Sequence, residues 1–347
     1  MKTPIRKLLL TSFLMLLIGA SNSFAQKNVA EFLQGNVADA KTLSTAYMEP
    51  FGKMFGNSLN GGWYQAARPH KKFGFNVSFV VTVATVPSDA KSFDVSKLKL
   101  TNLELVNPTN NISQTVSGAT SIGPWVNFKD DPSNNPAFQL PKGAGLPFTP
   151  MPIIQAGIGL PFHTEITGRF LPSLDVPKVG KVSLWGIGAK NEFKEFIPGL
   201  KMVPIDLSIF VGYTQFKSEF EIDYKPTQAN TPTGYNTSDF DDQKLALNAN
   251  GYTVRLLVGK TIPFLSVYVG LGYNHAVTDF GLQGNYAIGV APNYSKVEKD
   301  PFVLNYTHST FAGNAGLRVR LGVISINFDY TLGKYPLYSG GLGISFR

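Results

Sequence analysis

Hydrophobic and polar residues alternate one by one along several stretches of the chain, the period of a β-strand with two different faces. In the stretch 73–84, Val80 is the one apolar residue on the polar face. The pattern recurs at 205–214, 251–259, 265–274, 324–332 and 338–346, with Phe210 and Leu257 as further exceptions. Each stretch approaches the roughly 9–11 residues that a tilted strand needs to cross a bilayer. The apolar face of the first stretch consists of Phe73, Phe75, Val77, Phe79, Val81 and Val83.

A soluble β-sandwich would also alternate, but two details of these strands favour a membrane barrel. The polar faces carry mainly Gly, Ser, Thr and Asn, where a water-exposed sheet usually carries more Lys and Glu. The apolar faces often end near a tyrosine, as at Tyr213, Tyr252, Tyr273 and Tyr330, which is typical of an interfacial aromatic girdle. The strands therefore predict an all-β fold, a transmembrane antiparallel barrel of about 12–14 strands over residues 71–347.

Residues 26–70 lack this alternation and predict a helical or irregular plug that packs in or against the barrel. Val37, Ala40, Leu43 and Tyr47 fall at helix spacing. The apolar content argues against the alternative, a disordered tail. The large residues expected to anchor the plug are Phe51, Phe55, Trp63 and Tyr64.

The connections between strands differ strongly in length. The stretches 261–263 and 321–323 read as short periplasmic turns, whereas 226–243, 286–301 and 107–150 read as external loops. The stretch 107–150 is the longest, and loops of that length are usually functional or mobile. We expect it to be the contact surface if the barrel binds a partner.

The first 25 residues have the order of a secretory signal. Lys2, Arg6 and Lys7 precede the apolar run 8–20, and the small residues Ser23 and Ala25 mark a cleavage site. The apolar run is too short for the alternative, a membrane anchor. At the other end, a strand with the penultimate residue Phe346 resembles the terminal signal that barrel-assembly machinery reads. We therefore expect residence in the cell outer membrane, with the assembly machinery and membrane lipid as partners.

Composition supports this class of protein. Charged residues make up 16% of the chain, below the roughly 25% of soluble proteins. The net charge of +8 falls to +5 once the three signal cations are removed, and the remaining charge is spread out, so no nucleic-acid partner is expected. The chain has no cysteine, so disulfides do not stabilise it.

Three stretches carry a family resemblance: Tyr47-Met48-Glu49-Pro50-Phe51-Gly52-Lys53, Leu59-Asn60-Gly61-Gly62-Trp63-Tyr64 and Trp185-Gly186-Ile187-Gly188. They resemble a Bacteroidota family of uncharacterised exported proteins, a domain of unknown function with no activity to transfer. The order of plug and barrel also resembles the long-chain fatty-acid transporter (FadL-like) barrels, which implies a hatch and about fourteen strands. The Asn-Pro-Ala hatch signature of that family is not found in 26–70, so this second likeness is architectural.

Candidate chemistry is sparse. His308-Ser309 are adjacent and would point to opposite faces of a strand, so no catalytic pair and no enzyme is predicted. The other histidines are isolated, and the acidic residues of the loops lack a strict calcium pattern, so neither a metal nor a cofactor is expected.

Charged residues predicted to face inward are the candidates for lining the lumen: Asp206, Arg255, Arg318, Arg320 and Asp329. They form either a structural network that fills the barrel or a pore lining that selects by charge. Two functions stay open. One is passive transport of small hydrophobic compounds, gated by the plug; the other is a non-transporting structural or partner-binding barrel, for example one associated with secretion machinery.

Overall fold

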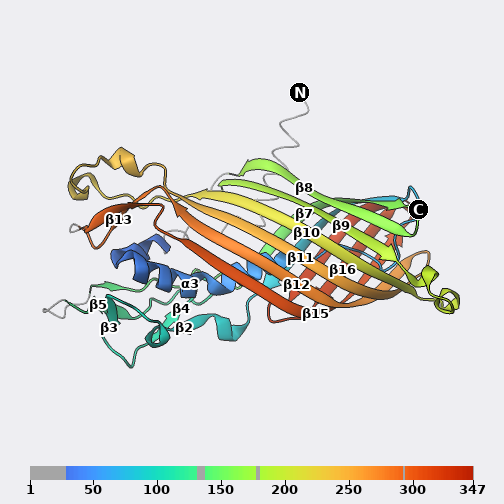
Figure 1. The fold of residues 1–347 in the computed structure, drawn as a ribbon, viewed down its shortest axis with the longest axis horizontal. Helices are drawn as coiled ribbons and strands as arrows, with labels where there is room; N and C mark the ends of the chain where they lie inside the picture. The colour runs from blue at the N-terminus through green and yellow to red at the C-terminus, as the bar shows by residue number, and fades with distance from the viewer. Residues whose placement is uncertain (1–28, 131–136, 177–179, 292–293, 347) are drawn as a thin grey trace.

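The computed structural model describes residues 29–130, 137–176, 180–291 and 294–346 (Figure 1). Ten strands of these residues form a closed barrel in the order β1-β17-β16-β15-β12-β11-β10-β9-β8-β7, and every neighbouring pair is antiparallel. The predicted all-β antiparallel barrel is confirmed. The predicted number of 12–14 strands is too high, because the remaining short strands lie in the connections and not in the wall. The predicted signal, residues 1–25, lies outside the described residues.

The barrel strands are β1 (Phe75–Thr85), β7 (Phe148–Leu160), β8 (Thr164–Val176), β9 (Gly180–Glu192), β10 (Asp206–Glu221), β11 (Lys244–Thr261), β12 (Leu265–Gln283), β15 (Val303–Leu321), β16 (Ile324–Thr331) and β17 (Leu337–Phe346). The short strands of the connections are β2 (Ser92–Asp94), β3 (Leu103–Leu105), β4 (Ile112–Gln114), β5 (Trp125–Phe128), β6 (Phe138–Gln139), β13 (Asn285–Ile288) and β14 (Lys296–Lys299). The long α-helix α3 (Val37–Ser58) precedes β1, and no described helix is both long and apolar enough to cross a membrane.

The first strand closes the barrel by pairing with β17 on one side and β7 on the other. Its register with β17 runs from Phe75↔Phe346 to Ala84↔Leu337. The strand starts two residues later than the alternation predicts, because Phe73 has a φ of 63° and lies in the turn that leads into β1. A bulky side chain rarely adopts this backbone conformation, so the turn at Phe73 is strained.

The barrel has two different ends. At the short-turn end, β7–β8, β11–β12 and β15–β16 are joined by residues 161–163, 262–264 and 322–323. At the long-loop end lie the connections 86–147, 222–243 and 284–302. The predicted loop 107–150 is corrected in two ways: its last residues belong to β7, and β4–β6 lie within it. We call residues 86–147 the platform, since β2–β6 form two small sheets there beside α3 (Figure 1).

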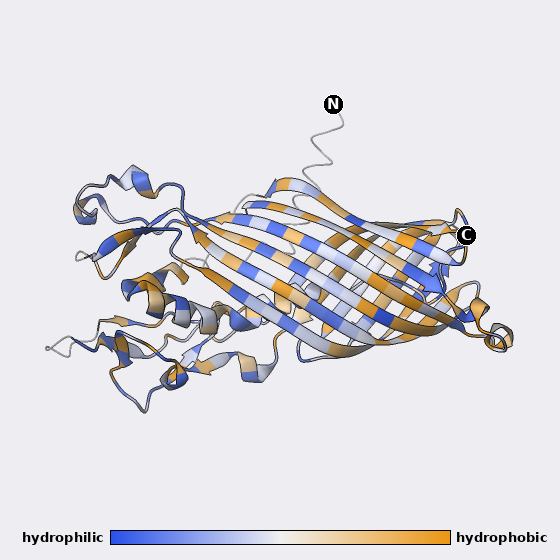
Figure 2. Ribbon diagram, in the orientation of Figure 1, coloured by the Kyte–Doolittle hydropathy of each residue, from blue (hydrophilic) through white to orange (hydrophobic). Residues whose placement is uncertain are grey.

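The outer surface of the barrel carries a continuous apolar belt, and the strands alternate in hydropathy along their length (Figure 2). A row of aromatic rings borders the belt toward the long-loop end, in contacts such as Trp185–Tyr213 at 5.2 Å and Tyr213–Tyr252 at 4.8 Å between centroids. Further along this girdle, Tyr273 contacts Phe311 and Tyr330 contacts Tyr338. From Leu265 to Tyr273 the belt is about 20 Å tall, for a rise of roughly 3.3 Å per residue and a strand tilt of about 40°.

The inner surface is divided along the barrel axis. Toward the long-loop end the inward residues are apolar and form one buried cluster with α3; they include Ile153, Leu184, Phe216, Leu247, Phe280 and Leu304. Toward the short-turn end the buried inward residues are polar or charged, including Ser78, Glu165, Lys190, Asp206, Arg318 and Asn327. The interior therefore has an apolar half and a polar half, and the chain before β1 passes through both.

Candidate functional site

The segment before β1, residues 29–70 as described, is the plug, and it runs through the barrel from the long-loop end to the short-turn end. At the first end, Leu33 accepts a backbone hydrogen bond from Gly289 in the β13–β14 connection. Midway, the Asn57 amide donates to the Tyr335 carbonyl at 2.9 Å. At the last residue, the His70 imidazole lies 3.1 Å from Ser345 Oγ of β17. The plug is thus held at both ends and along its length.

Helix α3 is tied to the platform through one carboxylate. Asn36 caps the helix by accepting from the Asp39 backbone N–H at 2.7 Å. The fully buried Asp39 carboxylate then accepts hydrogen bonds from the backbone N–H groups of Thr101, Asn102 and Leu103, at 2.6, 2.7 and 2.9 Å. A carboxylate that receives several N–H donors is strongly held, so Asp39 fixes the helix to the platform.

The indole of Trp63 lies in a cradle of lumen-facing glycines. A Cβ added to Gly188 or Gly212 would lie 3.0 or 2.9 Å from its ring, closer than ordinary side-chain contacts. The Arg169 guanidinium covers the indole with its carbon 3.5 Å from a ring centroid. Glycine at both positions therefore leaves room for the indole, and the Arg169 guanidinium stabilises the indole by a cation–π contact.

Arg169 is also the main hydrogen-bond donor to the plug backbone. It donates to the carbonyls of Leu59 and Gly61 at 3.0 and 2.6 Å, and to the Gln155 side chain at 3.1 Å. The residue is 2% exposed and makes no ion pair with any described carboxylate. Backbone carbonyls and an aromatic face replace the counter-ion, so this buried charge depends on the plug for its partners.

Tyr64, the other aromatic of this turn, packs against Tyr268 and Phe210. Its hydroxyl contacts the Asn314 side chain at 3.1 Å, and Asn314 donates to Asp329 at 2.6 Å. Burial, reinforced by the Asp329 carboxylate, raises the pKa of the Tyr64 phenol, which keeps it neutral. The plug is therefore joined to β15 and β16 through a chain of hydrogen bonds that ends at the Asp329 carboxylate.

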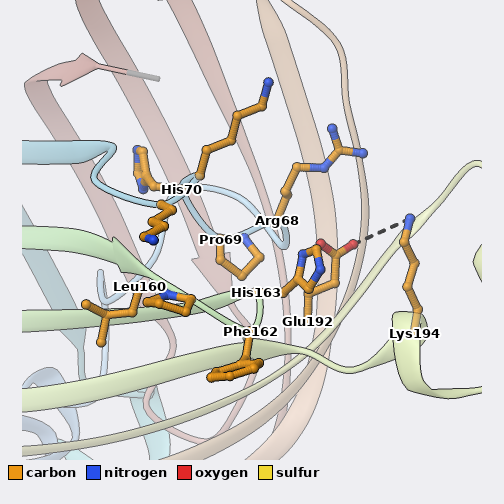
Figure 3. A pocket seen from close by; sticks show the side chains of 11 residues that line it. Arg68, Pro69, His70, Leu160, Phe162, His163, Glu192 and Lys194 are labelled. Atoms are coloured by element: carbon orange, nitrogen blue, oxygen red, sulfur yellow. Dashed lines mark ion pairs between the residues drawn. The ribbon is translucent and has the colours of Figure 1, made fainter.

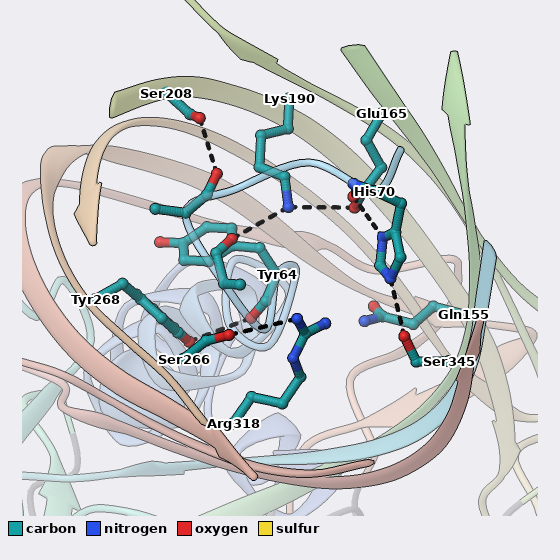
Figure 4. A network of polar contacts seen from close by, with 12 residues as sticks. Tyr64, His70, Gln155, Glu165, Lys190, Ser208, Ser266, Tyr268, Arg318 and Ser345 are labelled. Atoms are coloured by element: carbon teal, nitrogen blue, oxygen red, sulfur yellow. Dashed lines mark hydrogen bonds and ion pairs between the residues drawn. The ribbon is translucent and has the colours of Figure 1, made fainter. Parts of the chain in front are cut away.

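At the short-turn end the plug is held by charged groups (Figure 4). The Glu165 carboxylate lies 2.7 Å from His70 Nδ1 and 3.3 Å from the Lys190 ammonium. Lys190 also donates to the Ala66 carbonyl at 3.1 Å. Arg68 binds the buried Asp206 carboxylate at 2.7 Å. These contacts join the plug to β8, β9 and β10 in the polar half of the interior.

The residues predicted from the sequence fall into different surroundings. Asp206 and Arg255 are buried; Asp206 pairs with the plug, and Arg255 donates to Asn274 at 2.8 Å. Arg318 is 8% exposed and has a single weak hydrogen bond, to Ser266 at 3.4 Å, among the described residues. Arg320 is half-buried and donates to the Pro263 carbonyl. Asp329 accepts hydrogen bonds from the side chains of Tyr268, Asn314 and Thr331, and within the described chain it makes no ion pair with these arginines.

The aromatic residues predicted for the plug all contact the barrel or each other. Phe51 contacts Phe280 of β12, and Phe55 contacts Phe216 of β10 at 5.0 Å between ring centroids. Trp63 and Tyr64 belong to a separate buried cluster with Phe210 and Tyr268. The four side chains therefore divide between the apolar half and the polar half of the interior.

The β7–β8 ladder of the closed barrel has a gap in its backbone pairing toward the long-loop end. The ladder covers six residue pairs, from Leu160↔Thr164 to Gln155↔Arg169, and stops there. Beyond it, residues 148–154 pair only with β1, and residues 170–176 pair only with β9. Pro150 and Pro152 lie on one edge and Pro172 on the other. Proline cannot donate to a ladder, so the sequence of both edges disfavours pairing.

The comparisons with known proteins place the chain in a family. A family of unknown function (DUF6588) matches residues 1–346. The chain belongs to DUF6588. No curated protein matches this DUF6588 chain.

Solved structures similar to the DUF6588 chain are barrels of low identity. The translocator domain of the autotransporter NalP from Neisseria meningitidis is 11% identical, covers 94% of this chain and 100% of its own, and has a TM-score of 0.33. The transport unit of the autotransporter AIDA-I from Escherichia coli is 10% identical, with 86% and 99% covered and a TM-score of 0.31. The Ralstonia pickettii toluene transporter TbuX is 8% identical, with 86% and 98% covered and a TM-score of 0.20. At these scores no property is carried over from them.

Two of the sequence stretches that carry the family resemblance lie in contact within the DUF6588 chain. The stretch 59–64 supplies Trp63, and the stretch 185–188 supplies Gly186 and Gly188 of its cradle. Sequence reasoning missed Arg169, Glu165 and Lys190, because β8, which Pro172 interrupts, and β9 were not among the alternating stretches identified. The sequence feature that could have revealed them is a pair of charged residues an even number of positions apart, and therefore on one face of a strand. Such pairs are Glu165 and Arg169 on β8 and Lys190 and Glu192 on β9.

The adjacent pair His308-Ser309 of the DUF6588 chain does point to opposite faces: His308 is buried in the lumen and Ser309 is exposed outside. Ser309 instead lies 2.8 Å from His275 Nδ1, on the outer surface just beyond the aromatic girdle. Among the described residues, no acidic or amide side chain hydrogen-bonds the other ring nitrogen of His275. A nucleophile and base without an orienting group do not make a triad.

Proposed function

We propose that this chain is an outer-membrane β-barrel that lets small hydrophobic compounds pass from outside the cell into the membrane by parting β7 and β8 at the gap in their ladder. The apolar belt and its aromatic girdle support the membrane placement, because a belt of about 20–25 Å is what a transmembrane barrel presents to lipid. Short turns of such barrels face the periplasm and long loops face outward. The platform therefore faces the exterior.

The gap in the β7–β8 ladder carries this proposal. It lies beside inward-facing Met151, Ile153 and Leu171, which belong to the apolar cluster around α3. An apolar compound that displaces α3 side chains there meets apolar surface and then the gap. Further along the axis it meets buried charges such as Glu165 and Lys190. Because a compound entering that polar half would have to separate these buried charges from their partners, the favourable exit is sideways into lipid.

The test closes the gap with a chemical bridge. The natural chain has no cysteine, so Ile154→Cys with Phe170→Cys places two outward-facing thiols on the facing edges for a bifunctional maleimide. We expect bridging to reduce the uptake of an apolar fluorescent probe by cells that carry the chain to the level of cells without it. The matched control is Val211→Cys with Val254→Cys, whose positions are direct partners in the intact β10–β11 ladder.

The outcomes separate the two functions that the sequence left open. Loss of uptake on bridging the gap, with uptake retained after bridging the control pair, supports transport. Uptake equal to that of cells without the chain in every variant points to the non-transporting barrel, with the platform as the partner surface. Exposed apolar residues on the platform, Ile122 at 63% and Trp125 at 46%, favour that second function.

We also infer that the protein is exported and is a Bacteroidota protein. The order of charges, apolar run and small residues in 1–25 supports export, and the resemblance of the three quoted stretches supports the source. Sequencing the N-terminus of protein purified from outer membranes should give Gln26. A chain that keeps residues 1–25 would count against the export signal.

A further inference from the structure

A pocket of about 470 Å³ opens at the short-turn end, well away from the gap (Figure 3). It spans the rim of the barrel, from Leu160 and Phe162 on the outer side to Glu192 and Lys194 on the inner side. Phe162 is 80% exposed, and neighbouring Phe73 is 65% exposed. The pocket therefore connects the lipid-facing surface with the polar mouth of the lumen.

The lining of this pocket is strongly cationic. Arg68, Lys71, Lys72 and Lys194 line it against one carboxylate, Glu192, a formal excess of three positive charges. Arg68 is paired with Asp206 and Lys194 with Glu192. Lys71 and Lys72 make no ion pair within the described chain, although the Lys72 ammonium lies 5.1 Å from the Phe73 ring. Two cations are therefore free to meet an anion.

The backbone around the pocket is unusual. Four non-glycine residues of the described chain have positive φ, and Phe73, Phe162 and His163 are three of them, at 63°, 60° and 53°. Two of these line the pocket, and the third follows Lys72 directly. Large residues in the left-handed region are strained, and such strain tends to cluster at binding sites. Phe162 and His163 lie in the tight turn between β7 and β8, and Phe73 lies in the turn that leads into β1, so two tight turns shape this side of the pocket.

We propose that this pocket binds the phosphate of an anionic phospholipid of the periplasmic leaflet, with Lys71 and Lys72 on the phosphate and Phe162 and Leu160 against the acyl chains. The ligand needs an anionic head and an apolar tail because the lining has both characters on opposite sides of the rim. The assignment rests on the proposed membrane orientation but not on transport. Inorganic phosphate could also bind the two lysines, but it has no acyl chain to contact Phe162.

The test is lipid retention by the purified full-length chain. Native mass spectrometry from zwitterionic detergent should show phosphatidylglycerol retained in preference to phosphatidylcholine. The double variant Lys71→Gln with Lys72→Gln should lower this preference about tenfold or more, since each cation near an anionic headgroup contributes to binding. The control is Lys97→Gln with Lys99→Gln, the same change of charge at two exposed lysines of the platform.

A second variant and a second probe identify the source of the anion. Phe162→Ser should weaken phosphatidylglycerol retention while leaving the binding of inorganic phosphate, measured by calorimetry, unchanged. Phosphatidylglycerol retained equally by all variants overturns the site. Inorganic phosphate bound in a Lys71- and Lys72-dependent way, with no lipid retained, overturns the phospholipid as the ligand. Heat-modifiable gel mobility reports for each variant whether the barrel has folded, and a variant that fails it is replaced by the single Lys72→Gln change.

Discussion

Replacing Arg169 with methionine should release the turn of the plug that contains Trp63 while leaving the barrel closed. Methionine keeps much of the side-chain volume but has no donor for the Gly61 carbonyl and no charge for the indole. Among the described residues, Arg169 is the only side chain that hydrogen-bonds the Gly61 carbonyl, at 2.6 Å. The Leu59 carbonyl keeps a second donor, the Thr214 hydroxyl at 3.3 Å.

The size of the effect follows from these contacts. A buried carbonyl without a donor costs about 1–3 kcal/mol, and weakening the bond to Leu59 adds about 1 kcal/mol. A desolvated cation–π contact contributes about 2 kcal/mol. Removing a buried charge that has no carboxylate partner offsets part of this loss. The expected net change is about 2–4 kcal/mol in the free energy of opening the plug, or roughly 30- to 1,000-fold in the open population.

Hydrogen–deuterium exchange read by mass spectrometry measures this opening directly. Peptides covering 59–70 should exchange faster by that factor, while peptides from β11 and β12 keep their rates. The control is Arg320→Met, at a half-buried arginine that donates to the Pro263 carbonyl of a turn. Unchanged exchange in 59–70, or an equal increase in the control, would refute the assignment of Arg169 as the residue that holds this turn.

Three further changes test other parts of the structure. Phe79→Arg, in the middle of the apolar belt, should destabilise the folded barrel by about 2–4 kcal/mol in urea unfolding from lipid vesicles, whereas Thr307→Arg, outside the belt, should change it little. Gly188→Ala should overpack Trp63 and cost about 1–3 kcal/mol, seen as a lower unfolding midpoint with an unchanged slope. Asp39→Asn should replace an acceptor with a donor opposite backbone N–H groups and cost about 2–4 kcal/mol, seen as faster amide exchange at 101–103; equal exchange rates would show that the carboxylate is not what fixes the helix.

The strands that alternate cleanly could be predicted from the sequence because one face forms the exposed apolar belt and the other faces the barrel interior. This holds for β1, β10, β11, β12, β16 and β17. It fails for β7 and β8, where Pro150, Pro152 and Pro172 interrupt the pattern. The same prolines lie on the edges that do not pair, so the weak sequence signal and the gap in the β7–β8 ladder have one physical cause.

The partners of the inward charges could not be predicted. Alternation placed Asp206 and Asp329 on the inner face, but which group each one meets depends on the path of the plug. Asp206 binds Arg68 of the plug, and Asp329 binds Asn314 and Tyr268. The plug sequence does not alternate, so it does not show how far the plug enters the barrel or which of its faces meets each strand. The wall residues that its charged side chains contact therefore cannot be read from the sequence.

The exceptions to alternation indicate where the plug lies against the barrel wall. Val80, Phe210 and Leu257 are apolar residues on polar faces, and all three are at most 1% exposed. Phe210 and Leu257 pack in the cluster of Trp63 and Tyr64, and a Cβ on Gly62 would lie 2.7 Å from Val80. An apolar side chain that faced a water-filled lumen would bury no apolar surface. When it packs against the plug, its apolar surface is removed from water, which stabilises the fold. Single apolar residues on the polar face of a barrel strand therefore indicate where an internal segment lies against the wall, and in this chain the three converge on 62–64.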